Sequence, residues 1–362
     1  QDQHGQESIP QKPSLQGKLS PTKPTDRPLS AASERLYDKW GLYQDSTNEF
    51  YTSFRYSEVK GIGKEAGVTR RDPTTVLKLG DTYYVWYTRR KTVKDRDHNN
   101  RPSIRDEQTR DTPVFDWDLA EIWYATSTDG IHWQERGVAI TRGPAGGFDD
   151  RSVFTPDILV DGGKYYLYYQ TAQAPYRHRS LHQIGMSWAD TPDGPWQRWP
   201  ALVLPVGGGA VVAGDEDDAD QIERFGTWDS QKIHDPFVLK RDGQIWLYFK
   251  GVGYGRHYRD DLGCTWGVAI ADRPEGPFVR SPLNPITNSG HETFLYPFRA
   301  GVVAVTSLKG PEKNTVQYAP DGLNFEVMGK VSAPPIAAGP YVPDAFTDNK
   351  DGQGITWGLA HI

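Results

Sequence analysis

The chain has 362 residues and a formal net charge of −6, with 36% hydrophobic residues, 12% aromatic residues, 37 Gly and 27 Pro. This length allows one large domain or two ordinary ones, and the lack of a basic stripe argues against a nucleic-acid partner. No apolar run approaches the roughly 20 residues that a membrane-spanning helix needs. The many strand-forming aromatic residues and turn formers favour an all-β fold.

The N-terminal part divides into two segments. Residues 1–29 are polar and rich in Pro, so we expect a flexible arm that cannot bury enough apolar surface to fold. In residues 30–47, which begin SAASERLYDKWGLYQ, Ser30 or Ser33 is placed to cap a short helix that Gly41 would end. A helix this short is marginal alone and needs a surface on which to dock.

Residues 48–362 repeat one pattern, in which an acidic phrase opens an apolar strand and an aromatic strand and a hairpin follow. Aromatic strands are predicted at 82–90, 164–171 and 244–251. Hairpins with Asp, Pro or Gly at the turn are predicted at 122–133, 184–196, 266–278 and 316–328. The phrases are RRDP, FTPD, HDPF, GHETF and YVPD, with their acids at Asp72, Asp157, Asp235, Glu292 and Asp344.

Five such units of four strands predict a five-bladed β-propeller. The last unit ends at Ile362 before its outer strand, and residues 48–59 (NEFYTSFRYSEV) are the candidate to supply that strand. Closing the ring in this way would remove the exposed sheet edges.

In a propeller, acids that open different blades converge at one mouth of the central channel. Converging carboxylates push their pKa values apart, which is what glycoside hydrolysis needs. An Asp at a strand entrance also commonly just caps a turn. We favour that structural role for Asp157 and Asp344, and a functional role for Asp72, which follows two Arg, and Asp235, which follows His234.

The stretches SAASERLYDKWGLYQDSTNEFYTSFRY and GVTRRDPTTVLKLGDTYYVWYTRRKT, with IHDPF and GHETF, resemble glycoside hydrolase family 117 over residues 30–362. That family contains the α-1,3-(3,6-anhydro)-L-galactosidases, or neoagarobiose hydrolases. The resemblance implies a five-bladed propeller and a homodimer that exchanges its N-terminal helical segment. It also implies inverting exo-cleavage of agar-derived oligosaccharides without an organic cofactor.

By this resemblance Asp72 is the general base that activates water, and Asp235 is the supporting carboxylate. GHETF matches the position of the acid, which leaves His291 and Glu292 as alternative proton donors. An imidazolium has a pKa near 6.5 and suits proton donation near neutral pH. We favour His291 as the donor with Glu292 as its partner, and we expect roughly 6.5–9.5 Å between Asp72 and the donor, as inversion requires.

Residues at phrases or strand ends near the channel mouth are candidates to bind the sugar: Arg71, Trp117, Thr155, Gln170, His182 and His234. Trp117 stands out because acidic residues flank it in the insertion DTPVFDWDLA, whereas core packing is expected for Trp86, Trp123, Trp188 and Trp246. His178 and His182 lie in a polar stretch that is equally consistent with a surface loop.

No metal ligand set can be named. The acidic run GDEDDAD at 214–220 lacks the Gly and terminal Glu of an EF-hand loop, so we interpret it as a solvated insertion. A structural cation, or one in the central channel, stays open. Cys264 is the only cysteine, which excludes an intrachain disulfide and favours a buried structural thiol.

Two alternative functions keep the same fold: a glycosidase for another red-algal galactan fragment, and a carbohydrate-binding propeller without catalysis. The differences among RRDP, HDPF and GHETF argue against the binding propeller, which should repeat its binding residues on every blade. The sequence starts at Gln1, which fits a removed export signal and leads us to expect a periplasmic or secreted protein.

Overall fold

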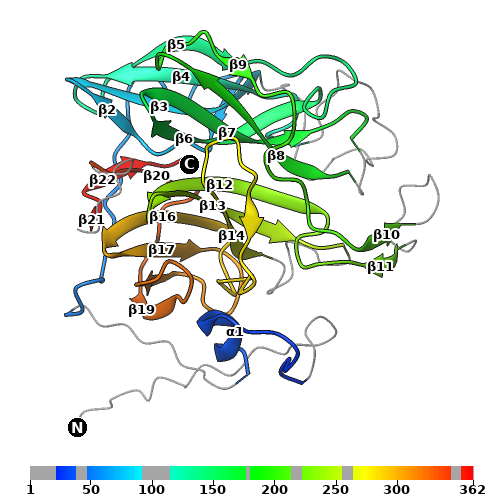
Figure 1. Ribbon diagram of the computed structural model, residues 1–362. Coiled ribbons are helices and arrows are strands. Elements are labelled where there is room, and N and C mark those ends of the chain that lie inside the picture. The colour runs from blue at the N-terminus through cyan, green and yellow to red at the C-terminus, as the bar shows by residue number, and fades with distance from the viewer. Residues whose placement is uncertain are drawn as a thin grey trace.

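The computed structural model describes residues 22–37, 47–91, 115–176, 180–212, 222–254, 264–343 and 352–361. Within these ranges the chain forms one short helix and is otherwise built from β-strands, which confirms the all-β prediction (Figure 1). No helix in them has the length and apolar character to cross a membrane. Several predictions fall outside the described residues: those for Gly41, His178, Asp344, the run 214–220 and most of the arm 1–29.

The first half of the molecule is two antiparallel meanders. The first consists of β1 (Val68–Arg71), β2 (Leu77–Leu79), β3 (Thr82–Lys91), β4 (Glu121–Ser127) and β5 (Trp133–Ile140). The second consists of β6 (Ser152–Asp161), β7 (Lys164–Ala172), β8 (His182–Ala189) and β9 (Gln197–Arg198). The predicted aromatic strands at 82–90 and 164–171 are β3 and β7, and each pairs with a strand on both of its sides.

The second half repeats the arrangement. The third meander consists of β12 (Lys232–Arg241), β13 (Gln244–Val252), β14 (Thr265–Ala271) and β15 (Val279–Arg280). The fourth consists of β16 (Glu292–Arg299), β17 (Gly301–Ser307), β18 (Thr315–Ala319) and β19 (Glu326–Lys330), and β21 (Gly352–Gln353) pairs with β16. Two small ribbons complete the fold, β10 (Ala210–Val212) with β11 (Ile222–Phe225), and β20 (Gly339–Tyr341) with β22 (Trp357–Leu359).

Apolar side chains fill the spaces between successive meanders, so the core is divided into clusters. The first and second meanders share one cluster, the second and third share another, and the third and fourth share the largest. Burying an aromatic side chain in such a cluster contributes about 1.5–3 kcal/mol. Trp86 and Trp246 are buried there as expected, whereas Trp123 and Trp188 are half-buried beneath a cation, at 3.9 and 4.0 Å.

The inner strands of three meanders begin with the same local geometry. Asp72, Thr155 and Asp235 each precede a Pro and have left-handed φ angles of 54°, 48° and 50°. The strand registers also shift just after Thr155 and Asp235. The residue of the second meander that corresponds to Asp72 and Asp235 is therefore Thr155, and the equivalence that the acidic phrases suggested for Asp157 is wrong.

Asp157 instead joins three meanders. Its Oδ1 accepts the N–H of Thr75 at 2.9 Å and its Oδ2 accepts the N–H of Val238 at 2.9 Å, and the residue is 1% exposed. Thr75 follows the first meander's Asp–Pro phrase and Val238 follows the third's. This confirms the structural role favoured for Asp157.

Replacing Asp157 with Ala should destabilise the protein, because two buried N–H groups would lose their acceptor. At about 1–3 kcal/mol for each unsatisfied group, we expect the free energy of unfolding to fall by about 3 kcal/mol. Urea denaturation followed by fluorescence measures this. Asp190→Ala, whose side chain is 71% exposed, is the control and should change stability little. Equal stability of the two variants would contradict the bridging role.

The strand expected over residues 48–59 is not formed. This segment is held by side chains instead of a backbone ladder: Phe50 packs on Tyr318 with ring centroids 4.9 Å apart, and the Tyr56 hydroxyl donates to the Ala333 carbonyl at 2.5 Å. Lys60 then bridges to His132 of the first meander. The segment therefore runs from the fourth meander to the first without extending a sheet.

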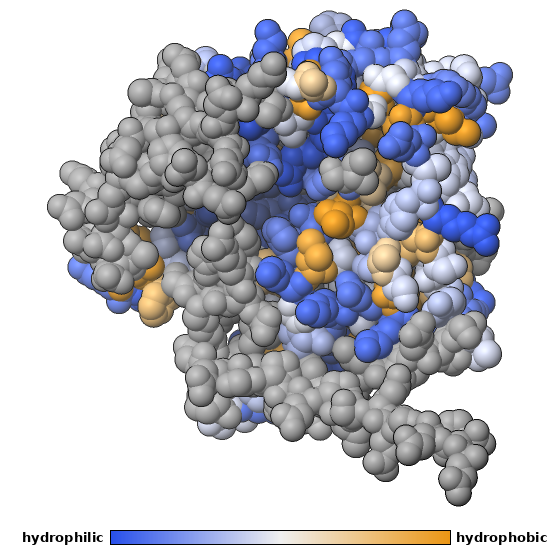
Figure 2. Space-filling view, turned by 180° about the vertical axis from the view of Figure 1, so that it is seen from behind, coloured by the Kyte–Doolittle hydropathy of each residue, from blue (hydrophilic) through white to orange (hydrophobic). Residues whose placement is uncertain are grey.

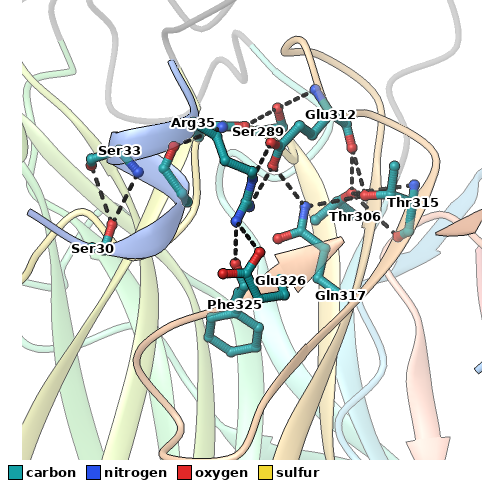
Figure 3. A network of polar contacts seen from close by, with 12 residues as sticks. Ser30, Ser33, Arg35, Ser289, Thr306, Glu312, Thr315, Gln317, Phe325 and Glu326 are labelled. Carbon is teal, nitrogen blue, oxygen red and sulfur yellow. Dashed lines mark hydrogen bonds and ion pairs between the residues drawn. The ribbon is translucent and has the colours of Figure 1, made fainter. Parts of the chain in front are cut away.

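Helix α1 (Ala31–Arg35) is short, and Ser30 caps it by accepting the Ser33 N–H at 3.2 Å. Figure 3 shows how it docks on the fourth meander of its own chain through a buried network. Arg35 Nε and Nη2 donate to Glu312 at 2.6 and 2.9 Å, and Nη1 donates to the Phe325 carbonyl at 2.6 Å. The docking surface that so short a helix needs is thus supplied by a bidentate ion pair as well as by packing.

Arg35→Ala should release α1 from the fourth meander. Its partner Glu312 has a side chain only 3% exposed and would be left as an unpaired buried carboxylate, at a cost of about 3–5 kcal/mol. Thermal unfolding and the rate of proteolysis before residue 48 measure the effect. Arg27→Ala, which loses only an exposed contact to the Pro28 carbonyl, should leave both unchanged. A proteolysis rate equal to that of the parent would show that the ion pair does not hold the helix.

Candidate active site

The left-handed residues of the inner strands bring together the acids that the sequence singled out. Asp72 directly follows β1, Asp235 lies in β12 and Glu292 begins β16, so each comes from a different sheet. On the face opposite that of Figure 1, hydrophilic residues line a hollow near the middle of the molecule (Figure 2). The rest of that surface is largely hydrophilic, with apolar residues scattered in small groups.

Three side chains surround the Asp72 carboxylate. Arg71 Nε donates to its Oδ2 at 2.9 Å, and the hydroxyls of Thr88 and Thr155 donate to the same oxygen at 3.3 Å. The Thr155 backbone N–H also donates to Thr88 Oγ1 at 2.7 Å, which ties the Thr88 hydroxyl to the backbone of the second meander. Arg71 and Thr155, both expected at the sugar, are thus placed on the carboxylate itself.

These contacts favour the ionised form of Asp72. Burial alone would raise the pKa of Asp72, but the Arg71 guanidinium, His361 and Lys250 outweigh it and hold the pKa below its ordinary value. Asp72 is therefore a carboxylate at neutral pH, and it is only 6% exposed. A carboxylate held in one orientation by three donors is suited to accept a proton from water.

Lys250 is the centre of the opposite side of the site. Its Nζ donates to Asp235 Oδ2 at 2.5 Å and to the His291 carbonyl at 2.9 Å, and it lies 3.1 Å from His291 Nδ1. The side chain is 2% exposed. Burial alone would lower the pKa of Lys250, but the negative charge of Asp235, and that of Glu292 when it is ionised, raise it above the ordinary value. A buried ammonium is thus shared between a carboxylate and the GHETF segment.

His291 and Glu292 are in contact, with Nε2 and Oε1 3.5 Å apart. The Lys250 ammonium, followed by burial, lowers the pKa of His291 to about 2. Burial raises the pKa of Glu292 to about 8, and the charges of Asp235 and Asp72 act in the same direction while Lys250 opposes them. Both shifts favour a neutral His291 beside a protonated Glu292, whereas the sequence favoured His291 as the proton donor.

The supporting carboxylate Asp235 also titrates abnormally. Burial raises its pKa above the ordinary value, and the short contact with Lys250 only partly offsets this. Asp72 adds to the increase. Asp72, Asp235 and Glu292 therefore lie within electrostatic reach of one another, and the directions of their shifts favour the ionised form of Asp72 and the protonated form of Glu292. Two carboxyl groups of opposite protonation state in one site are what acid–base hydrolysis requires.

A second group of expected binding residues lies beneath the site. Gln170 Nε2 and His182 Nδ1 are 2.8 Å apart, His182 Nε2 is 3.1 Å from the Tyr176 hydroxyl, and Gln170 and His182 are 2% and 1% exposed. The rings of His182 and His234 lie 5.0 Å apart. Burial lowers the pKa of both His residues well below the ordinary value, so both are neutral. Gln170 and His182 are therefore buried and bonded to neighbouring side chains, whereas the sequence predicted that they contact the sugar directly.

His234 differs from that pair because its Nε2 is buried without a hydrogen-bond partner among the described residues. An unpaired buried polar atom is costly, and a ligand hydroxyl can satisfy it. His234 directly precedes Asp235, so its free nitrogen belongs to the same part of the site. Of the two His expected to bind substrate, His234 is the one with a buried ring nitrogen that has no partner among the described residues.

Trp117 is half-buried in a cluster of rings. Its indole stacks on Phe154 at 4.6 Å and on Phe115 at 5.2 Å, and it meets Tyr176 and His182 edge-on at 5.2 and 4.9 Å. The side chain thus packs against the group that contains His182. This packing holds the indole in place, and sugar binding by Trp117 stays a prediction.

The sequence reasoning missed Lys250, Thr88 and His361. Lys250 had a signal, since it is the only charged residue in the apolar aromatic strand QIWLYFKGV, and such a charge needs a buried partner. Thr88 and His361 had none, because a Thr near a strand end and a His near the end of the sequence are common. Their contacts to Asp72 exist only in the folded chain.

Among the described residues, no group of three or more His, Cys, Asp or Glu side chains is arranged to hold a metal ion. Cys264 is buried, and its Sγ lies 3.8 Å from His291 Nδ1. Burial raises the pKa of its thiol to about 11, so it stays protonated. This fits the expected structural thiol.

Comparisons with known proteins agree with this geometry. The family model of glycosyl hydrolases family 43 matches residues 67–259. The structure of Zg3597, a family 117 glycoside hydrolase produced by the marine bacterium Zobellia galactanivorans, matches with a TM-score of 0.74 and 41% identity, over 87% of this chain and 86% of that chain.

More distant matches add less. Another glycoside hydrolase structure matches with a TM-score of 0.52 and 14% identity, over 77% of this chain and 78% of that chain, which is a likeness of fold alone. An uncharacterised protein of Mycobacterium tuberculosis (strain H37Rv) is 28% identical over 137 residues. That match spans 37% of this chain and 37% of the relative's length.

Proposed function

Because the chain belongs to glycoside hydrolase family 117, we propose that it releases 3,6-anhydro-L-galactose from the non-reducing end of neoagarobiose and longer neoagaro-oligosaccharides. The observation that supports this best is the split of protonation states, with Asp72 ionised and Glu292 protonated. Cleavage would proceed with inversion, which uses one base and one acid and needs no organic cofactor.

The proposed reaction takes place in one displacement. Asp72 accepts a proton from a water molecule as the water oxygen attacks the anomeric carbon of the terminal sugar. Glu292 gives its proton to the glycosidic oxygen, so the bond between that oxygen and the anomeric carbon breaks and a neutral alcohol leaves. Afterwards Asp72 is protonated and Glu292 is ionised, and exchange with solvent restores both. Inversion requires roughly 6.5–9.5 Å between the two carboxyl groups.

The remaining polar residues have supporting parts in this proposal. Asp235, paired with Lys250, would orient the sugar and help keep Glu292 protonated by its negative charge. Neutral His291 would accept or donate a hydrogen bond to the substrate or to Glu292. The unpaired Nε2 of His234 would bind a sugar hydroxyl.

The fold that we propose is a five-bladed propeller. Four blades correspond to the four meanders, and the small β20–β22 sheet would be the core of the fifth. Support comes from the bridge between Val76 and Tyr341, which places this sheet beside the first meander.

We also propose a homodimer in which the N-terminal segment takes part, in a periplasmic or secreted setting. Sedimentation of the parent and of a chain lacking residues 1–47 tests the dimer.

The test of the activity is NMR of neoagarobiose incubated with the parent protein and with Asp72→Asn, Glu292→Gln and His291→Ala. We expect the parent to release anhydrogalactose with the inverted anomer formed first, and Asp72→Asn and Glu292→Gln to release almost none. His291→Ala should keep measurable activity. Asp129→Asn, at an exposed turn of the first meander, is the matched control and should behave as the parent.

Three other results would change the proposal. Full activity of Glu292→Gln with loss in His291→Ala would return the proton to His291. No release by the parent, with hydrolysis of another red-algal galactan fragment, would keep the fold and change the sugar. Binding of these fragments without hydrolysis of any would support a carbohydrate-binding propeller.

A further inference from the structure

The β20–β22 ribbon lies directly against the stretch that follows Asp72. The Val76 N–H donates to the Pro340 carbonyl at 2.9 Å, and Val76 bridges in parallel to Tyr341. Tyr341 in turn pairs with Trp357 of β22. His361 follows β22, which pairs with β20, and β20 contacts the stretch after Asp72. The backbone near His361 is therefore connected through β20 to the chain beside the proposed base.

Gly339 shows how close this approach is. A Cβ atom at Gly339 would lie 1.9 Å from the carbonyl oxygen of Thr74 and 2.8 Å from that of Pro73. Backbone atoms cannot yield to such a contact as a flexible side chain would. The ribbon is thus seated on residues 73–74, immediately after Asp72, with no room for adjustment.

In this position His361 contacts Asp72. The backbone N–H of Asp72 donates to His361 Nδ1 at 3.3 Å, and Nδ1 lies 3.5 Å from Asp72 Oδ1. A ring nitrogen that accepts a hydrogen bond holds no proton, so neutral His361 must have its proton on Nε2. The imidazole side chain is 19% exposed and Asp72 is 6% exposed.

The contact matters because the Asp72 backbone is in an unfavourable conformation. Its φ of 54° lies in the left-handed region, which non-glycine residues adopt only when their surroundings hold them there. Three side chains hold the carboxylate, as described above, whereas His361 Nδ1 accepts the backbone N–H. This bond fixes the peptide plane from which the carboxylate projects.

We propose that His361 is a positioning residue, which holds the strained backbone of Asp72 so that its carboxylate faces the attacking water. This inference rests on the proposed function, in which Asp72 is the base. His361 itself touches neither water nor sugar in this scheme. The β20–β22 ribbon, which precedes His361, would therefore help to position the proposed base Asp72 of the first meander.

Protonation of His361 would replace its hydrogen bond from the Asp72 N–H with an ion pair to the Asp72 carboxylate. An imidazolium cannot accept the Asp72 N–H, and it would instead pair with the carboxylate and weaken it as a base. The other charged groups that act on Asp72 are Arg71 and Lys250, and the negative charge of Asp235 also acts on His361. As an imidazolium, His361 favours the ionised form of Asp72, so removing the imidazole while these groups stay in place should raise the pKa of Asp72.

The first test compares His361→Ala, His361→Asn and His132→Ala in hydrolysis of neoagarobiose. Asn can place a neutral oxygen near the position of Nδ1 and accept the same N–H, whereas Ala cannot. We expect kcat to fall about 10- to 100-fold in His361→Ala with KM within about threefold, and to recover largely in His361→Asn. His132, whose side chain is 61% exposed at a distant turn, is the control. An unchanged kcat in His361→Ala would overturn the proposal, as would an Asn variant no better than Ala.

The second test needs no substrate, so it separates this inference from the proposed function. NMR of ¹³C-aspartate-labelled protein, with Asp72 assigned from Asp72→Asn, follows the titration of its carboxyl group. We expect that titration to move to higher pH in both His361 variants. A purely structural role would lower the melting temperature and leave the Asp72 titration unchanged. If the parent protein hydrolyses no substrate, this titration still shows whether His361 interacts with the Asp72 carboxyl group.

Discussion

Replacing Glu292 with Gln is expected to lower kcat for neoagarobiose about 10³-fold, because the variant keeps the shape of the acid and loses its proton. General acid catalysis typically contributes about 10²–10⁴-fold. The pH profile should change in a specific way. Asp72 must be ionised, so kcat/KM of the parent rises as the pH passes its lowered pKa. Glu292 must be protonated, so kcat/KM falls again near pH 8.

Glu292→Gln should therefore remove the alkaline limb and leave the acid limb in place. A substrate with a nitrophenolate leaving group, which departs without a proton, should restore much of the rate to Glu292→Gln and little to Asp72→Asn. His291→Ala is the matched comparison and should keep the alkaline limb. If instead His291→Ala removes that limb, the proton belongs to His291, in spite of the nearby Lys250 ammonium.

Replacing Lys250 with Met is expected to reduce kcat about 100-fold and to destabilise the protein. Met retains the length of the side chain but leaves Asp235 as a buried carboxylate without its counterion, which costs about 3–5 kcal/mol. The Lys250 charge lowers the pKa of both His291 and Glu292. Its removal should thus raise the pKa of His291 toward 6.5 and move the alkaline limb of kcat/KM above pH 8.

Imidazole ¹⁵N NMR of His291 and a kcat/KM profile between pH 5 and pH 10 measure these shifts, with urea denaturation for stability. Lys240→Met is the control, because Lys240 lies in the same meander as Lys250 and pairs with Asp161 of the second meander at 2.7 Å, but is partly exposed. Its effect should stay below about 1 kcal/mol. The double variant Lys250→Met/Asp235→Asn should recover stability without recovering activity. Unshifted titration of His291 would show that Lys250 does not set its pKa.

Helix α1 illustrates how a local signal and a tertiary contact combine. Ser30 caps the helix, as a Ser before an Ala-rich stretch predicts, because capping involves neighbours in the chain. The ion pair between Arg35 and Glu312 joins residues 277 positions apart, and nothing in either segment indicates it. The start of the helix was predictable and its docking surface was not.

The sequence alone determined the strand order and the family. Alternating aromatic strands and turn residues specify sheets locally, and β3, β7 and β13 appear where those patterns lie. The phrases RRDP, HDPF and GHETF likewise named Asp72, Asp235 and Glu292, because such acids open the inner strands. Thr155 shows the limit, since the next acid, Asp157, was taken for the repeat position that Thr155 occupies.

Only the tertiary structure sets the surroundings of the groups that could hold the proton. A pKa depends on burial and on charges a few ångströms away, and these come from distant parts of the chain. The Lys250 ammonium lies 3.1 Å from His291 Nδ1 and lowers the pKa of His291, an effect that the GHETF segment by itself does not indicate. His361 reaches Asp72 from the far end of the sequence in the same way. Local motifs identify the residues of the site, whereas their pKa values are set by the packing of the sheets.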